Sequence, residues 1–359
     1  MSSISCGIIG LPNVGKSTLF NALTKNSVLA ANYPFATIEP NTGTVAVPDE
    51  RLEHLAQLYK TRRIIPANVT FVDIAGLVAG ASQGEGLGNK FLGAIRATTA
   101  VVHVVRAFGD SDVVHVDNEV NPKKDIDVIN TELVLADLQT IDRVLPRLQK
   151  EARANPKLKS QLEITERVRK VLDSGSPISS DPEIDLGEVA DLQLLSAKPM
   201  LYVFNVSEAS LANSNELKKM TQLVSPSQAV FICASLENEL KDLSDGDALE
   251  LLSSYGQKES GLVQLISAAY QALNLQSFLT AGEKEVRAWT IKKGATAVQA
   301  AGVIHSDFTK GFIAAEIVNY TNLMAAGSLA AARSLGQVRT EGRDYVMQVD
   351  DIVEFRFNV

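Results

Sequence analysis

The chain has 359 residues and a formal net charge of −8 at pH 7. This length indicates two or three domains with enough apolar residues for sizeable cores. The acidic balance provides no general attraction to nucleic acid, so any such affinity must come from a local patch. No stretch approaches the roughly 18 apolar residues of a membrane span, and the first residues lack the basic and apolar regions of a signal peptide. We therefore expect a cytoplasmic protein without a membrane partner.

The spacing of the cysteines and histidines predicts no metal site built from these residue types. Cys6 and Cys233 lie in apolar stretches, which favours reduced core thiols over a disulfide. The four histidines are scattered and lack the spacing of metal ligands; they stand at positions 54, 103, 115 and 305.

A glycine-framed segment, Gly10-Leu11-Pro12-Asn13-Val14-Gly15-Lys16-Ser17, has the spacing of a P-loop. It follows the apolar run 4–9, a predicted buried strand, and precedes a predicted helix over 17–25. Backbone N–H groups of such a loop surround phosphate oxygens, and the helix N-terminus adds a positive dipole end. We expect Lys16 to reach the β- and γ-phosphates and Ser17 to ligate Mg²⁺. The predicted nucleotide contacts of this segment are Asn13, Val14, Gly15, Lys16, Ser17 and Thr18.

A second strand-like run, 69–72, leads into Asp73-Ile74-Ala75-Gly76. In P-loop nucleotidases an Asp in this place holds the Mg²⁺ shell. We therefore expect Asp73 to be a metal ligand and the Gly76 N–H to act catalytically by sensing the γ-phosphate. The loop over 33–41 has neither helical nor strand periodicity, and we expect Thr37 to supply a second hydroxyl to Mg²⁺. Thr42 is the competing candidate, and a purely structural turn is the alternative.

Apolar strand-like runs alternate with helical segments along the first three quarters of the chain. This βα pattern predicts an α/β fold: a P-loop nucleotidase domain with a mostly parallel sheet and helices on both faces. Functional groups should then gather beyond the carboxyl ends of the strands. The predicted strands are 4–9, 69–74, 100–105, 200–204 and 229–233.

The segment from Asp125 to about residue 190 carries no strand signal. Apolar residues at a 3/4 spacing, with a break near 154–156, predict an inserted coiled-coil hairpin of two antiparallel helices. Pro146 should kink the first helix. Residues 143–170 contain nine Lys or Arg against three Glu, a local excess of positive charge. This hairpin is therefore a candidate RNA-contacting arm, with an ordinary solvated face as the alternative.

After Ser277 the apolar residues alternate at strand period around a predicted helix over 295–304. We interpret this part as a compact α+β recognition module without a catalytic constellation. Its alternating runs are 286–291, 312–318, 344–347 and 352–357. The predicted domains are the nucleotide-binding domain over 1–124 and 196–276, the helical hairpin over 125–195, and the C-terminal module over 277–359.

The end of the fourth predicted strand, Asn205-Val206-Ser207-Glu208, is a candidate base-reading site. Guanine-specific relatives carry Asn-Lys-x-Asp here; Glu208 is one methylene longer, and Val206 replaces the Lys that covers the base. The paired hydrogen bonds to guanine should no longer align, whereas the Asn205 amide can still meet adenine, so we predict a preference for ATP over GTP. Ser235 and Leu236, after the fifth strand, should close the other side of the base, unless they form an ordinary β–α turn.

These motifs together resemble the Obg-like ATPases, the YchF-type branch of the translation-factor-related P-loop proteins. The resemblance covers essentially the whole chain and rests on the P-loop 10–17, on 37–41, 73–77 and 80–89, and on Asn205-x-x-Glu208. It implies ATP hydrolysis with weaker GTP use, Mg²⁺ as cofactor, and a C-terminal TGS-like, ubiquitin-like β-grasp domain. It also implies association with ribosomes, through the large subunit or rRNA. Pro146 and the turn Val349-Asp350-Asp351 depart from the family pattern.

Position 77, where a water-orienting Gln is expected, is occupied by leucine. Intrinsic turnover should therefore be slow unless another group orients the water. His115 is the main catalytic candidate and His103 a lesser one, with a structural role as the alternative for both. Asn13 is suited to seat a monovalent cation such as K⁺ beside the phosphates. The leading function is a slow ATPase switch; a GTPase and a nucleotide-gated adaptor with incidental hydrolysis are the competing hypotheses.

Overall fold

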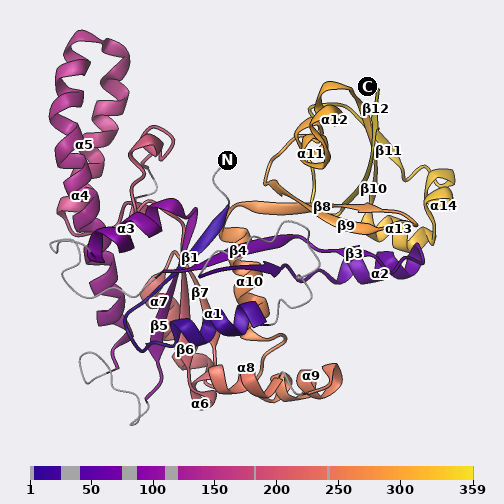
Figure 1. Ribbon diagram of the computed structural model, residues 1–359, viewed down its shortest axis with the longest axis horizontal. Coiled ribbons are helices and arrows are strands. Elements are labelled where there is room, and N and C mark those ends of the chain that lie inside the picture. The colour runs from indigo at the N-terminus through magenta and orange to yellow at the C-terminus, as the bar shows by residue number, and fades with distance from the viewer. Residues whose placement is uncertain are drawn as a thin grey trace. The chain divides into compact units, whose positions relative to one another are not determined.

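The computed structural model describes residues 4–25, 41–74, 87–109, 120–181, 183–240 and 243–358. The chain forms two compact units (Figure 1). Unit 1 consists of Met1–Val45 and Thr70–Leu273, and unit 2 of Ala46–Val69 and Asn274–Val359. Among the described residues, none of the helices combines the length and the apolar character needed to cross a bilayer.

Unit 1 is built on a six-stranded sheet with the order β2-β4-β1-β5-β6-β7. Strand β1 pairs in parallel with β4 and β5, and the parallel pairing continues through β6 to β7. The mixed α/β architecture with a P-loop type of sheet is thereby confirmed. The strands are β1 Ser5–Ile9, β2 Thr42–Ala46, β4 Asn68–Asp73, β5 Ala100–Ala107, β6 Met200–Val206 and β7 Gln228–Ile232.

Amphipathic helices follow the strands because their apolar faces cover the sheet. The core between the sheet and these helices includes Phe204, Leu211 and Met220, all of them buried. The helices are α1 Lys16–Lys25, α3 Leu87–Ala97, α6 Glu208–Leu211, α7 Ser214–Val224, α8 Ala234–Leu240, α9 Asp245–Ser254 and α10 Gly261–Ala272.

His103 lies inside β5 and is fully buried, which agrees with a structural role. Its ring packs on Tyr202 with centroids 5.4 Å apart, and neither ring nitrogen has a hydrogen-bond partner in the described part of the chain. Burial lowers the pKa of His103 from 6.5 to about 3. The histidine is therefore neutral in the folded protein well below the pH at which it protonates in the unfolded chain.

This burial predicts an acid-sensitive stability. Below pH 6.5 the unfolded chain binds a proton at His103 that the folded chain excludes until about pH 3, so stability falls as the pH falls. The expected contribution is a loss of about 2 kcal/mol between pH 7 and pH 5. Urea unfolding at both pH values should show a smaller loss for His103→Leu than for the parent protein. An identical pH dependence in the two proteins would contradict the prediction.

Two long helices, α4 Pro122–Ala154 and α5 Lys159–Asp173, form most of the segment between β5 and β6. Figure 1 shows them side by side, and a 3₁₀ turn at Pro156–Leu158 joins them. Arg169 of α5 bonds Asp142 of α4, and Gln149 of α4 bonds Glu166 of α5, so the two helices run antiparallel. Pro146 lies inside α4 without ending it. Ile141, Val168 and Leu172 form part of the shared core.

A buried carboxylate fixes α4 to the chain that returns to the sheet. Asp137 is fully buried. Its oxygens accept hydrogen bonds from the N–H groups of Leu195 and Ser196, each at 2.8 Å, and from the Ser196 hydroxyl at 2.7 Å. Burial raises the pKa of Asp137, and these hydrogen bonds oppose that shift. The segment before β6 is thus held by three hydrogen bonds that it donates to one side chain.

Unit 2 contains a second six-stranded sheet with the order β11-β10-β12-β8-β9-β3. Strands β8 and β12 run parallel, and antiparallel pairs flank them: β8 with β9 and β10 with β12. The strands are β3 Ile64–Ile65, β8 Leu275–Ala281, β9 Val286–Lys292, β10 Phe312–Asn319, β11 Arg339–Glu341 and β12 Asp351–Phe357. The helices are α2 Glu50–Leu58, α11 Ala297–Ile304, α12 Ser306–Lys310, α13 Tyr320–Ala326 and α14 Leu329–Ser334.

The structure differs from the sequence prediction in several strands of unit 2, among them the short strands β3 and β11, which were not predicted. Residues 344–347 form no strand; Val346 makes only an isolated bridge with Thr296, and the Gln276 side chain bonds the Met347 carbonyl at 2.7 Å. Strand β8 was not predicted. Its first five residues are all buried, so the alternation that marks a half-buried strand is absent.

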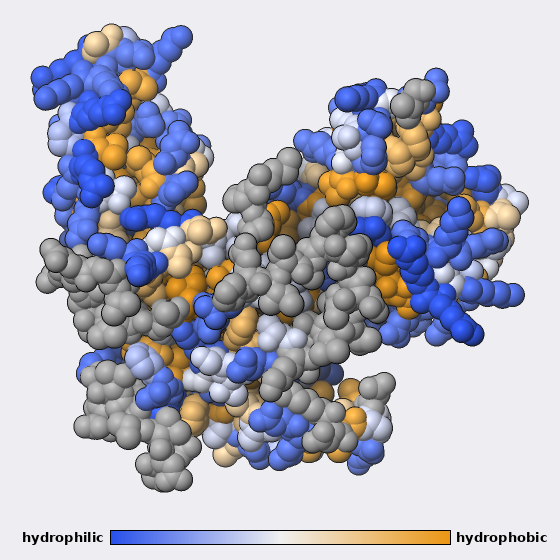
Figure 2. Space-filling view, viewed as in Figure 1, coloured by the Kyte–Doolittle hydropathy of each residue, from blue (hydrophilic) through white to orange (hydrophobic). Residues whose placement is uncertain are grey.

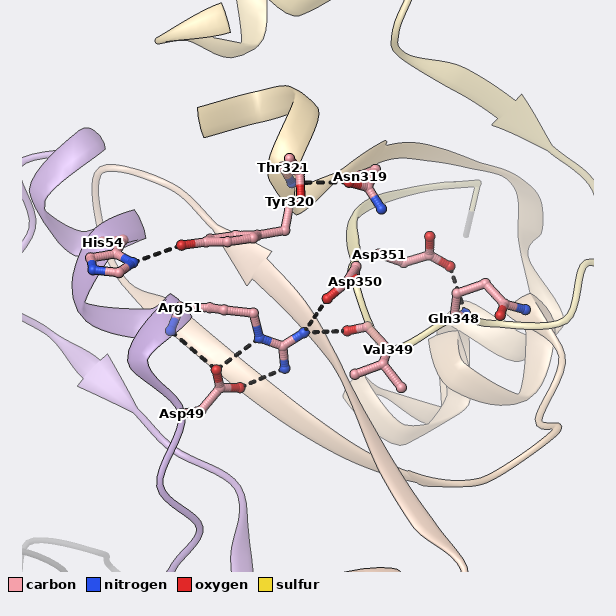
Figure 3. Close-up of polar contacts among 10 residues, drawn as sticks. All are labelled: Asp49, Arg51, His54, Asn319, Tyr320, Thr321, Gln348, Val349, Asp350 and Asp351. Carbon is pink, nitrogen blue, oxygen red and sulfur yellow. Dashed lines mark hydrogen bonds and ion pairs between the residues drawn. The ribbon is translucent and has the colours of Figure 1, made fainter. Parts of the chain in front are cut away.

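Residues 46–69 belong to unit 2, whereas the sequence pattern predicted them in the nucleotide-binding domain. Figure 3 shows the reason: Arg51 binds Asp49 through two nitrogens and also reaches the Val349 carbonyl and Asp350. On the next turn of α2, His54 bonds the Tyr320 hydroxyl at 2.7 Å. Strand β3 pairs with β9. These contacts join residues far apart in sequence, which no local pattern reveals.

Candidate functional site

The glycine-framed loop between β1 and α1 is shaped by two glycines that pack against neighbouring strands. A Cβ on Gly10 would lie 2.6 Å from the Val104 carbonyl oxygen of β5. Gly15 has φ +94°, and a Cβ there would lie 2.4 Å from Asn205 Nδ2. Both positions therefore require glycine, one for close approach and the other also for its left-handed backbone. Asn13 likewise has a positive φ of 63°.

Helix α1 begins directly after this loop, and its first turn presents the predicted phosphate and metal contacts. A helical hydrogen bond runs from Leu19 N back to Gly15 O at 2.9 Å and ties this turn to the loop. Ser17 and Thr18 are exposed on this turn, while Val14 is buried. The N–H groups at a helix start have no partner within the helix, so they are available to an anion.

Lys16, the first residue of α1, lies against Asp73, the last residue of β4. Lys16 Nζ stands 3.3 Å from Asp73 Oδ1 and also donates to the Ile74 carbonyl. The backbone N–H of Asp73 donates to Asn41 O at 2.8 Å, which fixes the end of β4. The sequence pattern predicted these two residues at one site, and the structure brings them into contact.

The donor set at Asp73 fits Mg²⁺. Asp73 Oδ1 is buried and, apart from its ion pair with Lys16, has no hydrogen-bond partner within the described ranges. A hard cation prefers such an oxygen, and Mg²⁺ usually takes one or two protein oxygens while phosphate and water supply the rest. The described residues contain no group of three or more His, Cys, Asp or Glu side chains suited to a metal. Ser17 and Asp73 are the described residues that would hold Mg²⁺.

Two of the predicted base-reading residues, Glu208 and Ser235, meet beyond the ends of β6 and β7, and a third, Asn205, lies near the end of β6. Asn205 Nδ2 donates to the Val14 carbonyl at 3.1 Å, so this amide group ties β6 to the loop. The Glu208 carboxylate accepts from the Ser235 hydroxyl at 2.7 Å and from the Tyr255 hydroxyl at 3.1 Å. These two hydrogen bonds lower the pKa of Glu208. Tyr255 was not predicted from the sequence, because no motif marks it.

Two residues predicted to contact the base have side chains in the core instead. Val206 is 3% exposed and Leu236 is 2% exposed, and both pack in the cluster beneath α7 and α9. Each lies in or next to an apolar stretch, and burying its side chain in the core is more favourable than exposing it at the surface. Their side chains are therefore closed to a base, and only their backbone groups remain available.

Glu237, in the first turn of α8, caps another helix. It is buried and accepts from the N–H groups of Gly261 and Leu262, at 2.6 and 3.3 Å, at the start of α10. A carboxylate at this position stabilises the helix N-terminus.

A narrow cleft lies between α1 and α8. Thr18 and Asn238 line it together with Gly15 and Asn205.

Three predicted site residues lie outside the described residues: Thr37, Gly76 and His115. The same holds for Leu77 and for most of the glycine-rich segment over 80–88. Their roles stay predictions.

The parallel sheet, the glycine-framed loop and the Lys16–Asp73 pair define a P-loop nucleoside triphosphatase. A family model described as a 50S ribosome-binding GTPase matches residues 5–136. A second, YchF-GTPase_C, described as a protein of unknown function (DUF933), matches residues 275–358.

Relatives match the chain over nearly its full length. The ribosome-binding ATPase YchF of Pasteurella multocida is 50% identical over 359 residues, which is 99% of each chain. The Bacillus subtilis protein of the same name is 46% identical, covering 99% of this chain and 100% of that protein. The solved Schizosaccharomyces pombe YchF GTPase has a TM-score of 0.87 at 39% identity, covering 99% of this chain and 98% of that chain. The chain belongs to the YchF family.

Proposed function

We propose that this protein is a Mg²⁺-dependent ATPase that acts as a molecular switch on ribosomes. The observation that carries the proposal is the Lys16–Asp73 pair at 3.3 Å beside the glycine-framed loop. It is supported by the names of the relatives, which are ribosome-binding ATPases. Glu208 in place of Asp supports ATP over GTP, because a guanine reader depends on two aligned hydrogen bonds.

The chemistry rests on positioning and charge. Ser17 and Asp73 would hold Mg²⁺, which would supply positive charge against the negative charge that develops on the phosphates. Lys16 leaves its pairing with Asp73 and binds the β- and γ-phosphates, while N–H groups of the loop and of α1 donate to the remaining oxygens. Asp73 is then available to ligate the metal together with Ser17. Because this arrangement holds charges in place before reaction, it stabilises the transition state without covalent chemistry.

Several finer assignments belong to the same proposal. Thr37 supplies a second hydroxyl to the metal, and the Gly76 N–H senses the γ-phosphate. Leu77 cannot orient a water, so intrinsic turnover is slow unless His115 orients the water or a K⁺ ion seated by Asn13 supplies positive charge. GTP is the poorer substrate.

The C-terminal unit is a TGS-like β-grasp module in this proposal. The parallel central strands β8 and β12 between antiparallel partners support it. Helix α11 packs on β9 and β10, as the single helix of a β-grasp does. Helices α4 and α5 together form a coiled-coil arm, and both parts contact the large ribosomal subunit or its rRNA.

Exposed basic residues lie around the tip of the arm. Closer to the sheet, Arg167 pairs with Asp181 and Glu183, and Arg169 pairs with Asp142 and Asp173. We define the tip patch by four exposed residues around the turn that joins α4 to α5. They are Lys150, Arg153, Lys157 and Lys159. Figure 2 shows strongly hydrophilic residues at this end of the arm.

The tip patch is expected to dominate the electrostatic part of ribosome binding. Lys157→Glu with Lys159→Glu should weaken association at least tenfold at about 0.1 M salt, because each lysine that neutralises a phosphate drives binding through counterion release. The slope of log affinity against log salt should also become shallower, by roughly 0.7 for each phosphate that is no longer neutralised. The matched control is Lys218→Glu with Lys219→Glu on α7, two exposed lysines away from the arm. Equal losses in both pairs would exclude a specific role for the tip.

The experiment that tests the function is turnover of ATP and GTP by the purified full chain. It compares Mg²⁺ with a chelator, K⁺ with Na⁺, and the presence with the absence of ribosomes. We expect slow, Mg²⁺-dependent ATP hydrolysis that ribosomes or K⁺ accelerate. Tight ATP binding and nucleotide-controlled ribosome binding without accelerated turnover would instead support the adaptor hypothesis. Faster turnover and tighter binding of GTP than of ATP would overturn the substrate assignment.

A further inference from the structure

Both oxygens of the Glu208 carboxylate are held by hydroxyl groups. The Ser235 hydroxyl donates to Oε1 at 2.7 Å, and the Tyr255 hydroxyl donates to Oε2 at 3.1 Å. The two donors come from different elements: Ser235 from the first turn of α8 and Tyr255 from the end of α9. Hydrogen bonds to an ionised carboxylate are among the stronger ones in proteins. The carboxylate is therefore restrained on two sides.

The chain around Tyr255 is built to place its hydroxyl. Leu252, one turn earlier, is buried in the core beneath α9 and anchors the end of the helix. Gly256 has φ +71°, and Gln257 N donates back to Leu252 O at 2.9 Å, which closes the helix and turns the chain away. A left-handed glycine after the last helical residues is the usual device for such an ending. The position of the Tyr255 hydroxyl is therefore set by the closed end of α9.

The restraint has opposite consequences for the two purine bases. Guanine offers two parallel donors, N1–H and the 2-amino group, which a carboxylate meets only by presenting both oxygens to the same edge. Turning Glu208 to do so would break the hydrogen bonds from Ser235 and Tyr255, and breaking bonds to a charged group is costly. Adenine offers a single amino donor on this edge, and one remaining lone pair of a restrained oxygen satisfies it.

We propose that Tyr255, together with Ser235, forms a hydroxyl clamp that keeps Glu208 from pairing with guanine, so that Tyr255 is a specificity-determining, positioning residue. This inference rests on the proposed ATPase function and on the base lying beside Glu208. The clamp discriminates by making the wrong base costly, a route to specificity that needs no additional contact with the correct base.

The test is the ratio of the dissociation constants for GTP and ATP, measured by calorimetry on the full chain. The double variant Ser235→Ala with Tyr255→Phe should lower this ratio at least tenfold, and each single variant should lower it less. Inosine triphosphate, which has the N1–H but lacks the 2-amino group, should gain less affinity than GTP in the double variant. Adding Glu208→Ala to the double variant should abolish the gain, because the effect acts through that carboxylate.

Two controls separate positioning from a merely structural role. Ser235→Thr keeps a hydroxyl and should keep the parent ratio. Tyr202→Phe with Ser253→Ala removes the same two kinds of hydroxyl elsewhere in unit 1, where they bond Asn130 and the Leu249 carbonyl, and should leave the ratio unchanged. A double clamp variant that weakens ATP and GTP equally overturns the inference and leaves the ATPase proposal intact. A parent protein that binds no ATP overturns both.

Discussion

Lys16→Ala is expected to weaken the binding of ATP with Mg²⁺ at least a hundredfold, or about 2.7 kcal/mol. Lys16 is the cation of the glycine-framed loop, and its side chain is held 3.3 Å from Asp73 with only 11% of its surface exposed. Removing it takes one positive charge from the phosphates and leaves the Asp73 carboxylate without its counter-charge. Calorimetric titration with ATP measures the effect directly.

The matched control is Lys90→Ala, which removes an exposed lysine from α3 in the same unit. It should leave ATP affinity within about twofold, since an exposed surface charge is screened by water and salt. Far-ultraviolet circular dichroism should be unchanged in both variants. ATP affinity that survives Lys16→Ala in a folded protein would contradict the assignment of the loop as a phosphate site.

The nucleotide-binding half was predictable because its signals are local. The apolar runs that became β1, β5 and β6 are buried parallel strands, whose near-continuous hydrophobicity stands out in a sequence. The spacing of Gly10, Gly15 and Lys16 reports a backbone path that only glycine permits. Asp73 followed from its place at a strand end. In each case a few neighbouring residues carried the prediction.

The sequence was least informative where distant contacts decide the structure. Residues 46–69 carry an ordinary helix pattern, and contacts with distant residues bind them to unit 2, including those of Arg51 with residues about 300 positions later. The buried positions of Val206 and Leu236 depend on core packing that the Asn-x-x-Glu spacing does not encode. Tyr255 reaches Glu208 across 47 residues through the end of α9. Tertiary packing overrides local pattern in all three cases.

Asp137→Ala should destabilise unit 1 by about 3 kcal/mol, roughly a 150-fold change in the folding equilibrium. The variant leaves the N–H groups of Leu195 and Ser196 and the Ser196 hydroxyl without their acceptor in a buried site. An unsatisfied buried donor costs more than the hydrogen bond contributed, because the desolvation penalty remains. Urea unfolding followed by circular dichroism measures the loss.

A graded series of variants distinguishes the three buried hydrogen bonds to Asp137 from a general effect of removing a charge. Ser196→Ala removes one of the three donors and should cost about 1 kcal/mol. Asp127→Ala removes an exposed carboxylate of the same helix that pairs with Lys123, and should cost less than about 0.5 kcal/mol. Because Asp137 holds the segment that leads into β6, the proposed base-reading residues at the end of that strand should also lose order, and ATP affinity should fall in parallel with stability. Equal losses for Asp137→Ala and Asp127→Ala would show that the three hydrogen bonds contribute nothing beyond a surface ion pair.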